Sequence, residues 1–315
     1  MNVRSLKTRT WKTWAKKGWH RTFRALQGAG VNLLPHHFYS GVPDLADLQR
    51  RGDWRKPRSM HGIAARDVDG QVALLAEWLA PHADFMQAHS IHRDSFVGGG
   101  ADGGYGEIEA DVLFAFVATN KPGRITQVGC GVSTAICLMA AEKAGYRPDI
   151  VCLEPYPSAY LQDAANKGAI RLVDKPAQIV DHDIIADLAA GDLLFIDSTH
   201  AVRPGSEVNY LIHEVLPRLK PGVWVHFHDI YFPYDYARDT LDGDMLFPQE
   251  STLLYAFLTG NDHFKIEASL SMVHYARPDA LKALIAKYEP AGQVDGLRNG
   301  AGTHFPSAAW LRVVA

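Results

Sequence analysis

The stretch Gln127-Val-Gly-Cys-Gly-Val-Ser-Thr134 decides the fold, because it joins a β-like run to a helix through a glycine-rich turn. Residues 124–128 predict the strand, and the small residues that follow predict a helix through Lys143. Gly129 and Gly131 allow a tight turn and close approach of a ligand, while Ser133 and Thr134 can cap the helix and offer hydroxyls. Thr134 stands where a dinucleotide-binding turn has its third glycine, which weakens a dinucleotide interpretation.

Around this turn, short apolar runs alternate with helical patterns. Strands are predicted at 149–153, 169–173, 192–196 and 223–227, helices at 105–119, 158–167, 207–219 and 249–259, and a final strand pair at 264–268 and 272–275. This alternation is typical of parallel βαβ units. We therefore predict an α/β fold with a doubly wound, mostly parallel sheet over 105–276, a helical N-terminal extension with a glycine-rich loop over 1–104, and a C-terminal tail over 277–315.

Acids follow two of the predicted strands. Glu154 lies 23 residues after Gly131 at the end of the second strand, and Asp197 ends the fourth. A carboxylate in the first of these positions suits the two hydroxyls of a ribose, and ligands of such sheets bind beyond the carboxyl ends of the strands. The pattern predicts a nucleoside ligand.

Histidines gather after the fourth and fifth strands. His200 follows Asp197 by three residues, and His226, His228 and Asp229 surround the end of the fifth strand. If these strands are neighbours, both loops open onto one cleft. Side chains alternate along a strand, so His226 and His228 share a face that Phe227 does not. His226 alone is interpreted as structural.

At these residues the chain resembles the class I S-adenosylmethionine-dependent methyltransferases, in particular the subgroup labelled methyltransferase domain 24, found with sugar and glycan modification genes. The resemblance covers roughly 105–275. It is carried by Val128-Gly-Cys-Gly-Val-Ser-Thr134, Phe195-Ile-Asp-Ser-Thr-His200, Gly205-Ser-Glu-Val-Asn-Tyr-Leu211 and Val225-His-Phe-His-Asp-Ile230.

The resemblance implies a seven-stranded, Rossmann-like sheet and S-adenosylmethionine as cofactor. The residues expected to bind it are Gly129, Cys130, Gly131, Ser133, Thr134, Glu154, Asp197 and Ser198, with 174–178 nearest the adenine. The expected reaction is O-methylation of a sugar or small-metabolite hydroxyl. His228, oriented by Asp229, is the first choice of general base and His200 the second, because a neutral histidine can take the hydroxyl proton near pH 7.

Three alternatives stay open. Asp197, His200, His228 and Asp229 could instead hold a divalent cation; this is less favoured, because Ile230 stands where metal-dependent relatives place an asparagine. The other two are a nicotinamide-dependent oxidoreductase and a cofactor-binding interaction protein without activity.

The charge distribution bears on partners. The net charge is −3, yet residues 1–27 hold eight of the 32 basic side chains and no acid. Trp11, Trp14, Trp19 and Phe23 recur at roughly helical spacing there, so we expect either a helix packed on the acidic body or an amphipathic helix on an anionic membrane. Basic residues do not dominate the rest of the chain, which argues against nucleic acid as a partner.

We expect a cytoplasmic protein, either free or peripheral at the membrane. The chain has three cysteines without a C-x-x-C pair, and it lacks a signal-like or membrane-spanning segment. A homo-oligomer is one alternative.

Overall fold

The computed structural model describes residues 3–34, 36, 38–96, 104–236, 247–290 and 303–315, with side chains from residue 16 onward. The chain divides into two compact units, residues 1–50 and 51–315. The first contains helices α1 (Val3–Gly28) and α2 (Leu45–Arg50). The glycine-rich run at 98–104 lies outside the described residues except for Gly104.

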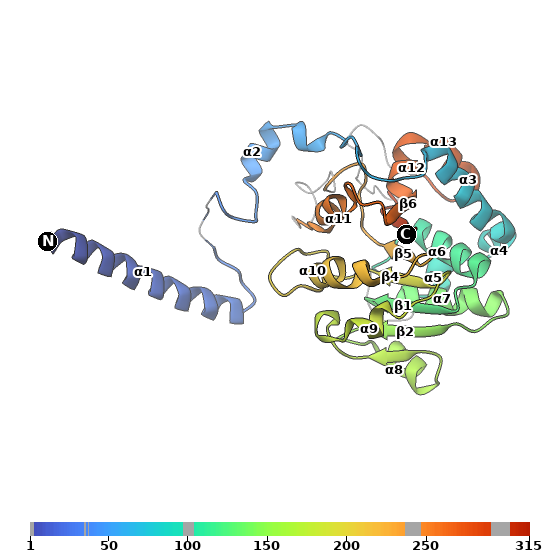
Figure 1. Cartoon of the computed structure of the whole chain (residues 1–315), viewed down its shortest axis with the longest axis horizontal. Coiled ribbons are helices and arrows are strands. Elements are labelled where there is room, and N and C mark those ends of the chain that lie inside the picture. The colour runs from blue at the N-terminus through green and yellow to red at the C-terminus, as the bar shows by residue number, and fades with distance from the viewer. Residues whose placement is uncertain (1–2, 35, 37, 97–103, 237–246, 291–302) are drawn as a thin grey trace. The chain divides into compact units, whose positions relative to one another are not determined.

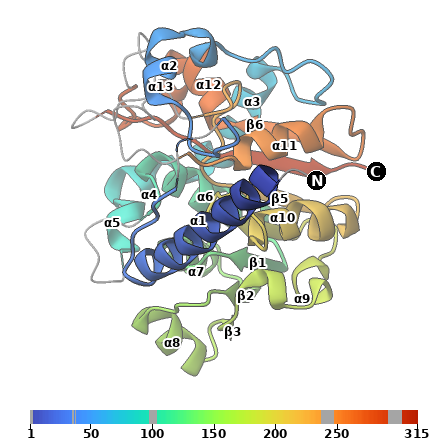
Figure 2. The same cartoon turned by 90° about the vertical axis from the view of Figure 1, so that its left-hand side faces the viewer.

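The second unit is built on a seven-stranded sheet in the order β3-β2-β1-β4-β5-β7-β6. Its strands are β1 (Arg124–Val128), β2 (Asp149–Leu153), β3 (Arg171–Val173), β4 (Leu193–Ile196), β5 (Trp224–Phe227), β6 (Phe264–Ser269) and β7 (Ala309–Val313). The first five are parallel, and β7 runs antiparallel to both β5 and β6. In Figure 2, β3 and β2 lie toward one edge of the sheet and β6 toward the other. The predicted α/β fold with a mostly parallel seven-stranded sheet is confirmed.

Helices cover both faces of the sheet (Figure 1). They are α3 (Val68–Leu79), α4 (Ala83–Ala88), α5 (Ile91–Asp94), α6 (Glu107–Asn120), α7 (Val132–Lys143), α8 (Ala159–Asn166), α9 (His182–Ala186), α10 (Glu207–Tyr210), α11 (Glu250–Leu258), α12 (Leu270–Ala276) and α13 (Pro278–Leu284). α3, α6 and α7 bury apolar side chains against one face, and α9, α10 and α11 against the other. Because the strands are covered on both faces, they read as continuous apolar runs in the sequence.

The prediction of a strand at 272–275 is wrong. These residues belong to α12, whose first turn is capped by Ser269: the Ser269 side chain accepts a hydrogen bond from the Met272 amide. The antiparallel partner of β6 is β7, from the segment predicted to be a tail. On β7, Trp310 packs with Trp78 and Phe116 on one face of the sheet, while Leu311 enters the core on the other.

Candidate functional site

The carboxyl ends of four neighbouring parallel strands meet at one edge of the sheet. Val128 pairs with Leu153 on one side and Ile196 on the other, and Ile196 pairs with Phe227. The predicted adjacency of the fourth and fifth strands is therefore confirmed. The residues that directly follow β1, β2, β4 and β5 are Gly129, Glu154, Asp197 and His228.

Gly129 allows the turn after β1 to lie against the end of β4. Its φ of +80° is in the left-handed region, and a Cβ added there would lie 1.6 Å from the carbonyl oxygen of Asp197. The Asp197 amide donates to the Val128 carbonyl at 2.9 Å, which fixes the two strand ends together. A side chain at Gly129 is thus incompatible with this contact.

A cavity of about 260 Å³ opens beside this turn, lined by Gly104, Tyr105, Gly129, Cys130, Gly131, Val132, Ser133, Glu154 and Asp197. A Cβ added at Gly131 would meet no atom within 4 Å, so the wall is open there. Two of the residues predicted to bind cofactor are not part of this lining. Thr134 is buried and donates its hydroxyl to Gln127 Oε1 at 2.7 Å, so it serves the core; Ser198 is half-buried next to Asp197.

Glu154 is held at the cavity wall by backbone amides. Its Oε2 accepts from the Cys130 amide at 3.3 Å and its Oε1 from the Tyr156 amide at 2.9 Å. The Glu154 amide in turn donates to the Val173 carbonyl, so the segment 174–178 begins next to this carboxylate. The carboxylate is half-buried and keeps acceptor capacity toward the cavity.

Tyr105 connects this cavity to the histidines. It is 6% exposed, its hydroxyl lies 3.3 Å from His226 Nε2, and its ring centroid lies 4.7 Å from that of His228. Burial raises the pKa of Tyr105 well above its usual value and lowers that of His226 well below its usual value, so both are neutral at pH 7. His226 stacks on Phe195 in the core, as expected of a structural side chain.

Two histidines and two aspartates converge next to the cavity. His200 Nε2 lies 3.4 Å from Asp197 Oδ1 and 3.7 Å from Asp229 Oδ2. His228 Nδ1 makes the same two approaches, at 3.4 Å and 3.7 Å. We call these four residues the His–Asp cluster. The structure thus brings together all the residues predicted from the sequence to be catalytic or metal-binding.

A second layer of residues fixes the His–Asp cluster. Glu250, at the start of α11, places Oε2 2.7 Å from His200 Nδ1. Ser307 donates its hydroxyl to Asp229 Oδ1 and its amide to Glu109 Oε1, both at 2.8 Å. Sequence reasoning did not single out Glu109, Glu250 or Ser307. The one available signal was that acids occur at positions 109 and 111 among the mostly apolar residues of α6, where both are buried.

Charges in the cluster shift its pKa values strongly. Burial would lower the pKa of His200, but contacts with Asp197 and Glu250 raise it to about 11. Burial likewise opposes protonation of His228, yet the charges of Asp197 and Asp229 raise its pKa to about 9. Although burial raises the pKa of Asp197, the adjacent histidines bring it well below its usual value. Without a further cation, the cluster therefore holds protonated histidines at neutral pH, not the neutral base expected from the sequence.

The aromatic run at 231–236, which follows β5, is partly buried in the core. Phe232 is fully buried and Tyr234 is 8% exposed, and they pack against Tyr255 and Tyr275. Phe232 and Tyr234 therefore pack over the end of the sheet and leave no exposed ring face on which a ligand could stack.

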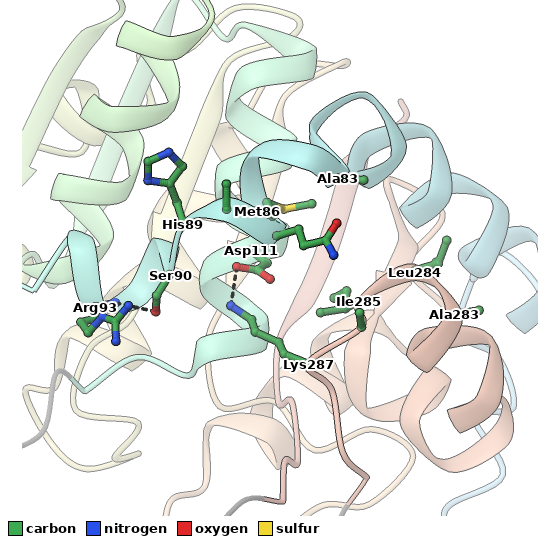
Figure 3. A pocket seen from close by; sticks show the side chains of 13 residues that line it. Ala83, Met86, His89, Ser90, Arg93, Asp111, Ala283, Leu284, Ile285 and Lys287 are labelled. Carbon is green, nitrogen blue, oxygen red and sulfur yellow. Dashed lines mark hydrogen bonds and ion pairs between the residues drawn. The ribbon is translucent and has the colours of Figure 1, made fainter.

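A separate, larger cavity of about 480 Å³ lies between α4, α5 and the end of α13 (Figure 3). It shares no lining residue with the cavity at the glycine-rich turn. Lys287 reaches across it to Asp111 Oδ1 at 2.8 Å, the ion pair drawn in Figure 3. Burial raises the pKa of Asp111 to about 6 despite this lysine.

One segment of the chain is similar in sequence to a known family of methyltransferase domains. Residues 126–230 match the sequence model of a family described as "Methyltransferase domain". This stretch holds the glycine-rich turn, Glu154 and the whole His–Asp cluster. The match supports the predicted class, an S-adenosylmethionine-dependent methyltransferase.

Other similarities are more distant. An uncharacterised protein of Archaeoglobus fulgidus is 28% identical over 163 residues, which are 48% of this chain and 72% of that protein. Among solved structures, an SAH-bound methyltransferase of Podospora anserina has a TM-score of 0.34 at 15% identity and covers 90% of this chain and 100% of its own. The plantazolicin methyltransferase BpumL, in complex with a triazolic desmethylPZN analog and SAH, has a TM-score of 0.40 at 13% identity, over 79% of this chain and 98% of its own.

Among the residues that the structure describes, no helix combines the length and the apolar composition needed to cross a bilayer.

Proposed function

We propose that this chain is an S-adenosylmethionine-dependent methyltransferase that acts on a hydroxyl of a sugar or another small metabolite. The observation that carries the proposal is the placement of Asp197. Its backbone packs on Gly129 of the glycine-rich turn, and its carboxylate belongs to the His–Asp cluster. Nucleoside binding and acceptor chemistry would therefore take place at adjoining parts of one sheet edge.

The cavity beside the turn fits the nucleoside of this cofactor. Glu154 offers a fixed carboxylate for the two ribose hydroxyls, and the open wall at Gly131 leaves room for close backbone approach. Ser133 adds a hydroxyl to the lining. When bound, S-adenosylmethionine supplies an electrophilic methyl group on a sulfonium centre.

The protein must orient the acceptor oxygen and stabilise it as its proton leaves. His228 is not suited to accept that proton alone, because its pKa of about 9 leaves it protonated at pH 7. We therefore assign this work to the His–Asp cluster as a unit rather than to His228 as a neutral base oriented by Asp229. The partly exposed Asp229 carboxylate takes the hydroxyl proton and passes it to solvent, while the protonated His200 and His228 stabilise the acceptor oxygen. The choice of a hydroxyl acceptor rests on this cluster and on the resemblance to sugar-modifying relatives.

Calorimetric titration with S-adenosylhomocysteine and, separately, with NAD tests the cofactor. We expect micromolar binding of the former and none of the latter; the reverse result would favour an oxidoreductase. Binding without methyl transfer to any hydroxyl-bearing acceptor in a tritiated-methyl screen would favour a non-catalytic protein.

Glu154→Gln and Glu154→Ala test the ribose contact. Loss of charge-assisted hydrogen bonds should weaken S-adenosylhomocysteine binding by about 2–4 kcal/mol in the alanine variant. Asp163→Ala, which removes an exposed acid paired with Lys167, is the matched control and should bind normally. Unchanged affinity in both Glu154 variants would contradict the assignment.

We also propose that the first unit binds an anionic membrane surface through α1. Eight basic residues and no acid lie among residues 1–27, together with three tryptophans. Cationic side chains attract anionic headgroups, and tryptophan favours the interfacial region. In this proposal the protein is cytoplasmic and peripheral at the membrane.

A further inference from the structure

We propose that Asp197, His200 and His228, with Asp229 beside them, bind one divalent transition-metal ion. The three donors Asp197 Oδ1, His200 Nε2 and His228 Nδ1 come from the loops after β4 and β5. Their ligand atoms all lie within 4.8 Å of one another. The proposal goes beyond methyl transfer, because ion binding can be measured without any methyl donor or acceptor.

The separations of the donors are those of ligands that share an ion. Nitrogen and oxygen donors lie about 2.1 Å from Zn²⁺, so two of them at a tetrahedral angle are about 3.4 Å apart. Both His–Asp197 contacts measure 3.4 Å. Direct N–H···O hydrogen bonds are commonly about 2.9 Å long, so both pairs are spaced more widely than a typical hydrogen bond.

His228 gives an independent indication. Its side chain is 7% exposed, and its Nδ1 is buried without a hydrogen-bond partner. A buried polar atom that lacks a partner costs free energy. Since this Nδ1 faces Asp197 and Asp229, an ion between them would satisfy it.

The second layer around the cluster is what a metal site requires. His200 has Nδ1 at 2.7 Å from the buried carboxylate of Glu250, so its Nδ1–H can donate there and leave Nε2 free as a ligand. Such carboxylate–histidine pairs orient metal-bound imidazoles. Asp229 is held by the Ser307 hydroxyl in the same way.

Backbone conformation supports a positioned site. Among the described non-glycine residues, positive φ values occur at Met60, Lys121, His200 and Asp229, so two of the four belong to the cluster. Such conformations are unfavourable for residues with a side chain and persist where the surroundings enforce them. They aim His200 and Asp229 at the same point.

The donor set selects the kind of ion. Two imidazoles with one or two carboxylates suit Zn²⁺, Fe²⁺ or Co²⁺, whereas Mg²⁺ and Ca²⁺ prefer sites made of oxygen donors. We therefore expect a first-row transition ion to bind much more tightly than Mg²⁺. Its further role, polarising an acceptor oxygen next to the cofactor cavity, rests on the proposed function.

The test uses the full-length protein, stripped with EDTA, dialysed against Zn²⁺, Co²⁺ or Mg²⁺ and assayed by inductively coupled plasma mass spectrometry. We expect about one Zn²⁺ or Co²⁺ per chain and at least tenfold weaker binding of Mg²⁺ by calorimetry. Co²⁺ should give visible absorption bands typical of mixed nitrogen and oxygen ligation. Loading no higher than that of an EDTA-treated blank would overturn the proposal.

Three variants locate the site. His200→Ala and Asp197→Asn should reduce Zn²⁺ affinity by at least 100-fold and remove the Co²⁺ bands, and Glu250→Gln should reduce affinity by about 10–100-fold. The matched control is His182→Ala, because Asp181, His182 and Asp183 form another His–Asp group among the described residues, on the exposed start of α9. Circular dichroism establishes that each variant is folded. Loss of the ion in His182→Ala, or full loading in folded His200→Ala and Asp197→Asn, would refute the assignment.

Binding of S-adenosylhomocysteine to the EDTA-treated protein separates this proposal from the proposed function. Metal binding without nucleoside binding would reject the methyltransferase and keep the site. Nucleoside binding without metal binding would do the opposite.

Discussion

Replacing Gly129 by alanine should break the junction between the glycine-rich turn and the His–Asp cluster. The new Cβ would lie 1.6 Å from the Asp197 carbonyl oxygen, and the φ of +80° would have to be kept by a residue that avoids it. The left-handed backbone alone costs roughly 1–2 kcal/mol. Because backbone is displaced as well, we expect a total loss of at least about 3 kcal/mol.

For a unit of this size, about 2–4 °C of Tm is lost per kcal/mol, so Gly129→Ala should melt about 6–12 °C lower than wild type in a calorimetric scan. Displacing Asp197 should also weaken S-adenosylhomocysteine and Zn²⁺ together. Gly131→Ala is the matched variant: its Cβ meets no atom within 4 Å and its φ of 166° lies outside the left-handed region.

We expect Gly131→Ala to melt much closer to wild type but to bind S-adenosylhomocysteine at least about tenfold more weakly, since a methyl group takes space at the cavity wall. Its Zn²⁺ affinity should be unchanged. The reasoning fails if Gly129→Ala retains the wild-type Tm, or if Gly131→Ala binds the nucleoside as wild type does.

Two further predictions concern parts of the chain away from the cluster. Burial raises the pKa of Asp111 from 3.8 to about 6. The protonated carboxyl therefore stabilises the folded state fully below about pH 4. This stabilisation, about 3 kcal/mol in total, is lost as the pH rises through 6. Asp111→Asn cannot titrate, so its free energy of urea unfolding relative to wild type should rise by about 2–3 kcal/mol between pH 4 and pH 7. A constant difference would contradict the role of burial. Deleting residues 1–50 should leave the Tm and nucleoside affinity of the second unit unchanged but abolish sedimentation with phosphatidylserine vesicles. A large fall in Tm would show instead that α1 packs on the body.

The sequence alone determined the elements that carry the site. The residue that follows each strand end can be read locally: Gly129, Glu154, Asp197 and His228. Because strands that alternate with helices run parallel, their carboxyl ends lie at the same edge of the sheet. These four residues therefore meet at that edge. That is why the residues that the sequence predicts to form the site lie close together in the structure.

Tertiary structure decided what local patterns do not encode. β7 lies between β5 and β6 in the sheet, yet in the sequence it follows β6 by about 40 residues. The apolar run at 272–275 fits a strand or a helix equally well in the sequence. It is helical in the structure, where Ser269 caps the first turn. The Thr134 side chain points into the core, where its hydroxyl donates a hydrogen bond to Gln127 Oε1. The cluster itself depends on Glu250 and Ser307, which lie 50 and 78 residues from the side chains they hold. The raised pKa values of its histidines therefore come from neighbours in the sequence together with distant residues: Glu250 raises that of His200, and Asp197, from another strand, raises that of His228.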